Sequence, residues 1–372
     1  MSGAILRRVA AAATLLLCSL VVAALATEGG LRALAALGNP VARGVAAADP
    51  YAVKVEPHGA FGYRQRAGAV LPYPNGTHAT ANRMRFRGPV VNEPKPPGTY
   101  RILLLGESST HGWSVNDSET IDAYLRADLA AERPGLRAEM VNLAYDGYDA
   151  YQIWQRLLSD GVPLSPDLII VNAGVNDVRN AYYPGLSDPD PRTLIWEGEM
   201  RRQREERARG GPSAWIRVKH LSFVARFPAV IRQKLAMRRA AWAASSAVSP
   251  HPDAAENFTR NVERIAAVAR TLSIPLVLST PPSALLLPDA PVMVPRSYWI
   301  VDRATTQRYR DTLATRMRAV AEHAGAEGQP VAYVAPQLPA RMFIDDCHLT
   351  PEGNRAMARE LARAIAPYLP RR

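Results

Sequence analysis

A serine and an aspartate–histidine pair follow two different apolar runs of this chain, and these residue types can together transfer an acyl group. Ser108 lies in a Gly-Glu-Ser sequence that begins at residue 106, directly after a run of leucines. His348 follows Asp345 by three residues near the end of the chain. A serine hydroxyl attacks an ester carbonyl when a histidine takes its proton and a carboxylate orients that histidine. We therefore predict Ser108 as the nucleophile, His348 as the base and Asp345 as the orienting group.

Acyl transfer also needs hydrogen-bond donors for the negative charge that develops on the carbonyl oxygen. Ser108 is expected in a strand-to-helix turn, where backbone N–H groups are unpaired and the helix dipole favours an anion. Gly147 comes four residues after the second apolar run, and a glycine lets the backbone approach a ligand. Asn176 lies in a Gly-Val-Asn-Asp sequence after the third run. The sequence thus predicts an oxyanion hole formed by Ser108, Gly147 and Asn176.

Each of these signatures taken alone has a structural explanation. Ser108 and Asn176 could cap helices, Gly147 could be an ordinary turn glycine, and His348 could be a surface or capping histidine. The next residue after Asp345, Asp346, is a rival orienting carboxylate. The joint order and spacing of the signatures favour the catalytic interpretation.

Other residues near the predicted site have less specific roles. His111 is expected to line the pocket or lie at the surface, because it would have to reach back over the turn to meet Ser108. The segment 284–294 could form a lid or could be structural. A group of aromatic residues near the catalytic loops could form a platform for a sugar ring or an acyl chain, although packing between helices and sheet is the favoured interpretation: Trp113, Tyr145, Tyr148, Tyr151, Tyr182 and Tyr183.

Five short apolar runs alternate with helical segments from residue 100 onwards. This alternation predicts a parallel sheet between two helical layers, with the active site at the carboxyl ends of the strands. The strands are expected at 101–105, 139–143, 167–172, 274–279 and 330–334, and the helices at 119–132, 150–159, 253–271, 304–323 and 350–368.

The ordered blocks resemble those of the SGNH hydrolases, also called the GDSL esterase/lipase superfamily, in its membrane-anchored or secreted bacterial type. The resemblance covers the chain from about Arg101 to its end. It implies a three-layer α/β/α flavodoxin-like sandwich with a five-stranded parallel sheet. It also implies that Ser108, His348 and Asp345 form a triad, with Gly147, Asn176 and the Ser108 N–H as the oxyanion hole. One departure is Glu107, where aspartate is usual.

The start of the chain has the features of an export signal. Arg7 and Arg8 precede an apolar run of 18 residues from Val9 to Ala26. The sequence Ala24-Leu25-Ala26 resembles a cleavage site, but the run is long enough for a spanning helix, which favours an uncleaved anchor. Both alternatives place the rest of the chain outside the cytoplasm, either anchored to the inner membrane or secreted.

The positive charge is concentrated in one segment. The net charge is +11, and between Arg201 and Arg239 there are twelve Lys or Arg residues against two Glu residues. This segment is either a solvated helical surface or a membrane-facing segment drawn to anionic lipid or an acidic polymer. Nucleic acid is a poor candidate partner, because the chain carries an export signal and no recognisable binding motif.

Three segments are expected: an N-terminal signal or anchor at 1–26, a membrane-proximal stalk and cap at 27–98, and the hydrolase domain at 99–372 with a basic insertion at 180–249. The two cysteines, Cys18 and Cys347, are not expected to form a disulfide.

These observations together predict a serine esterase that removes small acyl groups from an envelope glycan, without a metal or organic cofactor. The alternatives are a lipase or lysophospholipase acting on lipid esters, an O-acyltransferase acting on a glycan, and a non-catalytic relative that binds the envelope.

Overall fold

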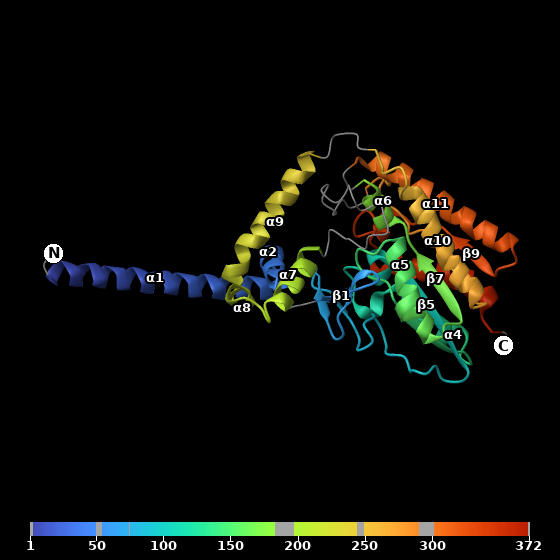
Figure 1. Ribbon diagram of the computed structural model, residues 1–372, viewed down its shortest axis with the longest axis horizontal. Coiled ribbons are helices and arrows are strands. Elements are labelled where there is room, and N and C mark those ends of the chain that lie inside the picture. Colours follow the sequence, from blue (N-terminus) through green and yellow to red (C-terminus); the bar gives the residue numbers. More distant parts are fainter. Residues whose placement is uncertain are drawn as a thin grey trace. The chain divides into compact units, whose positions relative to one another are not determined.

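The computed structural model describes residues 3–49, 54–73, 75–182, 197–243, 249–289 and 301–370. Contacts divide the chain into two compact units (Figure 1). The first comprises Met1–Ala52, Pro74–Gly76 and Glu205–Ala236, and the second comprises Val53–Tyr73, Thr77–Arg204 and Met237–Arg372. The segment boundaries expected after residues 26 and 98 stay predictions.

A five-stranded parallel sheet forms the centre of the second unit, with the strand order β6-β5-β7-β8-β9. The first strand in sequence therefore lies between the second and the third, as in flavodoxin-like folds, whose ligands bind where the strand order reverses. All five predicted strands are confirmed. Their bounds are β5 Thr99–Gly106, β6 Arg137–Asn142, β7 Leu168–Asn172, β8 Leu276–Ser279 and β9 Val331–Val334.

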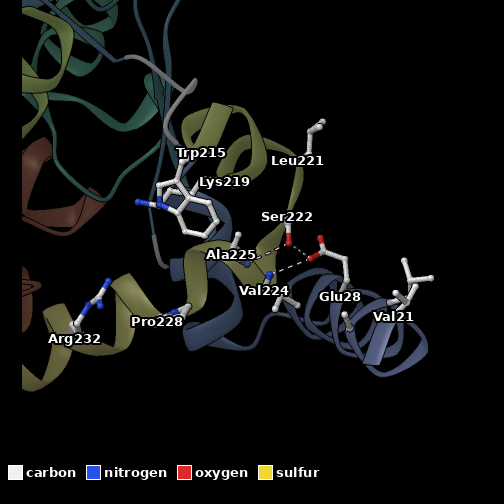
Figure 2. Close-up of a pocket in the computed structure, with 12 residues that line it drawn as sticks. Val21, Glu28, Trp215, Lys219, Leu221, Ser222, Val224, Ala225, Pro228 and Arg232 are labelled. Carbon is white, nitrogen blue, oxygen red and sulfur yellow. Dashed lines mark hydrogen bonds between the residues drawn. The ribbon is translucent and has the colours of Figure 1, made fainter. Parts of the chain in front are cut away.

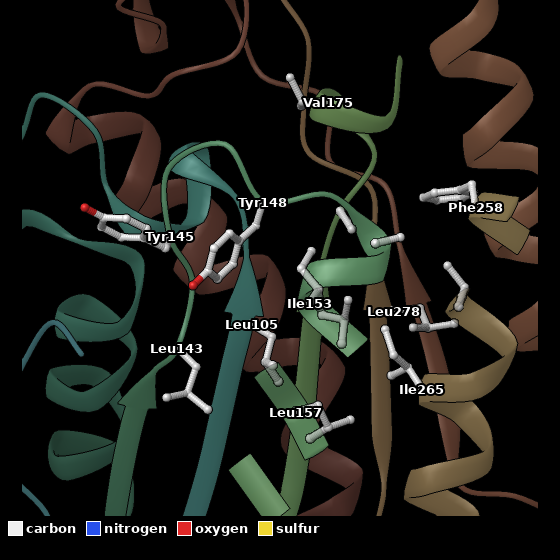
Figure 3. Close-up of a cluster of buried hydrophobic side chains, with 14 of the residues drawn as sticks. Leu105, Leu143, Tyr145, Tyr148, Ile153, Leu157, Val175, Phe258, Ile265 and Leu278 are labelled. Carbon is white, nitrogen blue, oxygen red and sulfur yellow. The ribbon is translucent and has the colours of Figure 1, made fainter. Parts of the chain in front are cut away.

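Helices cover both faces of this sheet. On one face, Ile102 and Leu104 pack against α4 (Ile121–Glu132) and α12 (Pro351–Ile365). On the other face, Leu103 and Leu105 pack in the cluster that Figure 3 draws. Because successive side chains of a strand point to opposite faces, a strand buried on both faces must be apolar throughout. The helices on this second face are α5 (Ala150–Arg156), which a π turn at Leu157–Gly161 extends, α10 (Ala254–Thr271) and α11 (Arg303–Ala326).

The predicted α/β/α sandwich is thus confirmed, and its helices begin where their sequences favour it. Thr120 and Thr350 accept hydrogen bonds from backbone N–H groups at the starts of α4 and α12, and Asp149 forms a capping box with Gln152 at the start of α5.

Two antiparallel hairpins precede the sheet and were not predicted. They are β1 (Val55–His58) with β2 (Gly62–Gln65), and β3 (Val70–Pro72) with β4 (His78–Thr80). Strands of three or four residues are too short to show a period in the sequence. The first hairpin and its turn bury Phe61 and Tyr63 in the same cluster as Tyr145 and Tyr148, so they belong to the core of the second unit.

The first unit contains the N-terminal helix α1 (Gly3–Ala36), followed by α2 (Pro40–Ala47). Within the described residues, α1 is the one helix long and apolar enough to cross a membrane, over Arg7–Ala36, and an 18-residue window of it has a mean hydropathy of 2.5. The helix continues ten residues beyond Ala26, where a stalk without a strong period was expected. The alanine- and leucine-rich sequence from Leu31 onwards favours helix, which explains this extension.

The predicted insertion is helical in part. Its helices are α7 (Glu197–Ala208), α8 (Ala214–Leu221) and α9 (Phe223–Ala243), and residues 183–196 and 244–248 lie outside the described residues. Most of the basic segment therefore lies on three helices.

Candidate active site

The turn after β5 depends on a glycine. A Cβ atom at Gly106 would lie 2.4 Å from the Thr110 Oγ1 and 2.6 Å from the Asn172 carbonyl oxygen, so a larger residue does not fit. The chain then enters the short helix α3 (Ser108–His111). This turn places Ser108 at the first residue of the helix, with its side chain only partly buried.

Ser108, His348 and Asp345 form a continuous hydrogen-bonded relay. The Ser108 Oγ lies 2.8 Å from the His348 Nε2, and the His348 Nδ1 lies 2.6 Å from the Asp345 Oδ2. The other oxygen of Asp345 accepts the backbone N–H groups of Cys347 and His348 at 2.9 and 2.8 Å. The structure thus brings together the serine, the histidine and the aspartate that the sequence singled out.

The rival carboxylate points elsewhere. The Asp346 Oδ1 lies 3.2 Å from the Arg303 Nη2, at the start of α11. Asp345 is therefore the carboxylate that contacts the imidazole.

The local charges favour an ion pair between His348 and Asp345. Burial alone would lower the pKa of His348, but the neighbouring Cys347 and Asp345 raise it well above its ordinary value. Burial alone would raise the pKa of Asp345, but the imidazole and the two backbone N–H groups hold it below its ordinary value. Burial also raises the pKa of the Cys347 thiol.

Two loops beside the turn carry the predicted oxyanion donors. Gly147 is buried with a φ of 85°, a conformation that favours glycine. The Tyr145 N–H donates to the Gly106 carbonyl at 3.2 Å, which holds the Gly147 loop against the Ser108 turn. Across the described ranges, the backbone N–H groups of Ser108 and Gly147 donate no backbone hydrogen bond.

The third predicted donor, Asn176, is buried at the start of α6 (Val175–Ala181). Its Nδ2 donates to the Tyr148 carbonyl at 2.9 Å. This hydrogen bond ties the amide of Asn176 to the loop that carries Gly147. Since β5 lies between β6 and β7, all three predicted donors follow adjacent strands at the same edge of the sheet.

Glu107 has a role that the sequence reasoning missed. Its side chain is fully buried and accepts the backbone N–H groups of Gly174, Val175 and Asn176 at 2.5, 2.7 and 2.6 Å. Burial raises the pKa of Glu107 to about 7, although the three N–H groups lower it in part. Glu107 therefore caps α6 from the adjacent strand, where Gly174 has no side chain to cap its own helix.

His111 is buried rather than exposed, so the surface alternative is wrong. Its Nδ1 lies 3.0 Å from the Asp146 Oδ1, and its Nε2 lies 3.3 Å from the Gln65 Nε2. The Asp146 carbonyl also accepts the Tyr63 hydroxyl at 2.6 Å. These contacts fix the residue directly before Gly147. The sequence carried no signal for them, because the partners come from distant segments.

The aromatic residues divide into two groups. Tyr145 and Tyr148 are fully buried in the core, as the packing interpretation predicts. Trp113 is partly exposed, and its ring centroid lies 4.5 Å from that of His348. Tyr183 and residues 290–294 of the predicted lid lie outside the described residues.

One group of side chains has the composition of a metal site. Within the described part of the chain, ligand atoms of Asp345, Cys347 and His348 lie within 4.8 Å of one another. Two of these side chains already bond to each other through the Nδ1 and Oδ2 atoms, and the raised pKa of Cys347 disfavours the thiolate that binds metals.

A parallel α/β sandwich with a serine–histidine–aspartate relay at the carboxyl edge of its sheet fits the class of serine hydrolases. The chain belongs to the GDSL-like lipase/acylhydrolase family, whose model matches residues 104–356. It is accordingly a serine-type carboxylic ester hydrolase, as the sequence predicted.

Solved structures with similar folds include three hydrolases. An acetylxylan esterase from Geobacillus stearothermophilus is 16% identical with a TM-score of 0.44, covering 74% of this chain and 99% of that one. An α/β hydrolase from the metagenome of Lake Arreo is 16% identical with a TM-score of 0.42, covering 73% and 97%. A GDSL-like lipase from Bacteroides thetaiotaomicron is 16% identical with a TM-score of 0.38, covering 72% and 89%. No curated protein matches the chain.

Proposed function

We propose that this protein is a cell-envelope esterase that removes small acyl groups, such as acetyl, from a glycan. The observation that carries the proposal is the relay from the Ser108 Oγ through His348 to Asp345, with distances of 2.8 and 2.6 Å. A nucleophile, a base and an orienting carboxylate in this arrangement are the groups that acyl transfer needs.

In the proposed mechanism, the Ser108 Oγ attacks the ester carbonyl while the His348 Nε2 takes the hydroxyl proton. The tetrahedral intermediate collapses, and His348 gives that proton to the departing alcohol, which leaves Ser108 acylated. Water then attacks the acyl group while His348 takes a proton from it. His348 gives this proton to the Ser108 Oγ as the bond between Ser108 and the acyl group breaks, which releases the free acid and restores the serine hydroxyl. Asp345 stabilises the imidazolium during both steps.

The proposed oxyanion hole consists of the N–H groups of Ser108 and Gly147 and the side-chain amide of Asn176. Within the described residues, the N–H groups of Ser108 and Gly147 have no backbone acceptor, which supports this assignment, as does the contact that holds the Gly147 loop beside the Ser108 turn. Each such donor typically stabilises a transition state by about 3 kcal/mol.

The proposed substrate rests on the surroundings of the base. Trp113 presents a partly exposed indole beside His348, and an aromatic face of this kind can contact a sugar ring while its N–H remains free to meet a polar group. The position of the Trp113 indole beside His348 therefore favours an acylated glycan as substrate over a simple short ester.

We place the catalytic unit outside the cytoplasm in this proposal. The apolar run of α1 supports either an anchor or a cleaved signal peptide, because Arg7 and Arg8 precede it. We favour the anchor, since the helix has the length of a membrane span.

A lipid ester is the second candidate substrate, and the surface of α8 favours it. Trp215 and Leu221 on this basic helix are 56% and 69% exposed. A helix with exposed apolar residues and basic charges can bring an enzyme to a lipid surface.

The test uses protein that starts at Thr27, assayed on aryl esters from acetate to decanoate beside Ser108→Ala. Rates that depend on Ser108 and fall steeply beyond short chains are expected. Rates that rise with chain length would favour the lipid ester. Absence of any serine-dependent turnover by folded protein, also with an acceptor sugar present, would contradict both substrates and would leave a non-catalytic binding protein.

A further inference from the structure

An apolar groove lies within the first unit, between the second half of α1 and the helices α8 and α9 (Figure 2). Its volume is about 760 Å³, within the range of about 300–1,000 Å³ typical of small-ligand sites. Its apolar wall is formed by Val21, Ala24 and Leu25 of α1 together with Trp215, Leu221 and Pro228.

The two walls of this groove are held together by polar contacts. The Glu28 carboxylate accepts the N–H groups of Phe223 and Val224, each at 3.0 Å, and the Ser222 hydroxyl at 2.9 Å. Arg32 donates to the Leu221 carbonyl at 2.8 Å. Glu28 thus caps α9 from α1, and the groove is a defined site rather than an accidental gap between helices.

The groove lies along the part of α1 that would reach the outer leaflet if α1 spans a membrane. Twenty residues separate Arg8 from Glu28, and a helical rise of about 1.5 Å per residue makes this about 30 Å, the thickness of a bilayer hydrocarbon core. If Arg8 lies at the cytoplasmic boundary of the hydrocarbon core, Glu28 lies at the outer boundary. Val21 and Leu25 then lie at acyl-chain depth in the outer leaflet, and they are 50% and 67% exposed.

Two basic side chains contribute to the lining of the groove. Lys219 and Arg232 line it, and the Lys219 Nζ lies 5.5 Å from the centroid of the Trp215 ring. The one acidic residue among those lining it, Glu28, already bonds to Arg32 at 2.7 Å. Tryptophan and basic side chains of this kind are typical of the layer where lipid head groups lie.

We propose that this groove binds one anionic phospholipid of the outer leaflet. One acyl chain lies along Val21, Ala24 and Leu25, and the phosphate lies near Lys219 and Arg232. The proposal rests on the retention of α1 in a membrane, which is part of the proposed function, but it does not depend on catalysis.

The test uses the full chain in nanodiscs, released for native mass spectrometry. We expect wild type to retain one phosphatidylglycerol in preference to phosphatidylcholine of the same chain length. Ala225→Trp should abolish retention by filling the groove. Lys219→Gln should weaken retention about fivefold, the effect of one basic residue near an anionic surface. Arg217→Gln is the matched control, since it removes the same charge from an exposed position of α8 outside the groove lining and should change nothing.

Three results would overturn the proposal. They are equal retention of the two lipids, equal losses in Lys219→Gln and Arg217→Gln, or a mature chain whose mass shows removal of residues 1–26. Circular dichroism of each variant excludes loss of fold as the cause. Ser108→Ala separates this proposal from the proposed function, because it should lose esterase activity and retain the lipid.

Discussion

The side chain of Glu107 accepts the backbone N–H of Asn176 at 2.6 Å, so the residue before the proposed nucleophile holds the residue proposed as an oxyanion donor. The same carboxylate accepts two further N–H groups, from Gly174 and Val175. Two adjacent strand ends, each with a predicted catalytic residue, are therefore joined by one buried side chain. Glu107 is a positioning residue in this arrangement.

Replacing Glu107 by glutamine should lower kcat with little change in KM. One carboxylate oxygen becomes an NH₂ group that must face a backbone N–H, which displaces either Asn176 or both Gly174 and Val175. A buried donor without an acceptor costs about 1–3 kcal/mol, so the unfolding temperature should also fall. A fall of about tenfold in kcat corresponds to about 1.4 kcal/mol of lost transition-state stabilisation.

Glu107→Asp is the informative companion variant, because it keeps the carboxyl group and shortens the side chain by one methylene. Its kcat should lie between those of wild type and Glu107→Gln. If Glu107→Gln lowered the unfolding temperature and left kcat unchanged, Glu107 would stabilise the fold without positioning Asn176.

Asn176→Ala should lower kcat by about 100- to 1,000-fold, as expected for loss of one oxyanion donor. The amide also holds the Tyr148 carbonyl, so part of the loss comes from movement of the Gly147 loop. Steady-state kinetics on an aryl acetate measure the effect. Labelling of Ser108 by a fluorophosphonate should be slowed as well, and unaltered kinetics would remove Asn176 from the proposed oxyanion hole.

Activity should fall on the acid side with the protonation of His348. The raised pKa of His348 keeps the imidazole charged above its ordinary value of 6.5, and a charged imidazole cannot take the proton of Ser108. The acid limb of kcat/KM should therefore lie above pH 6.5. Asp345→Asn removes the charge that favours the imidazolium, so it should move the limb to lower pH while reducing the maximal rate. A limb below pH 6.5 in wild type would contradict the prediction.

His111→Ala should destabilise the protein by about 1–3 kcal/mol, because it leaves the Asp146 carboxylate without a buried hydrogen-bond partner. It should also lower kcat, since Asp146 precedes the proposed donor Gly147. Denaturant unfolding and steady-state kinetics measure the two effects. His111→Asn can still donate to a carboxylate and serves as the conservative variant. Rescue of stability but not of kcat by asparagine would show that a hydrogen bond alone does not position the loop.

The sequence was informative wherever burial imposes a pattern. The central strands β5, β7 and β8 are largely apolar, buried on both faces, and end in Gly106, Asn172 and Ser279. These strands and the side chains after them could therefore be predicted. Asp345 and His348 could be predicted as a pair because His348 follows Asp345 by three positions within one loop.

Other contacts left no such pattern. Glu107 meets the start of α6 across nearly 70 residues, and His111 meets Gln65 across 46 residues. Neither partner is set by local spacing, because the fold alone brings them together. The hairpins formed by β1 to β4 were not predicted for a different reason. Strands this short derive their stability from packing against the core, as Phe61 and Tyr63 do, and not from their own periodicity.

The bond between Glu28 and Phe223 spans 195 residues of sequence. Synthesis proceeds from the N-terminus, so α1 forms while the segment that it must cap is still unmade. The start of α9 can receive its cap only after β5, β6 and β7 have emerged, while β8 and β9 are still unmade. The first helix to be made therefore acquires this partner only after three of the five strands, and the first unit, which ends at Ala236, can be completed before the last two strands of the sheet emerge.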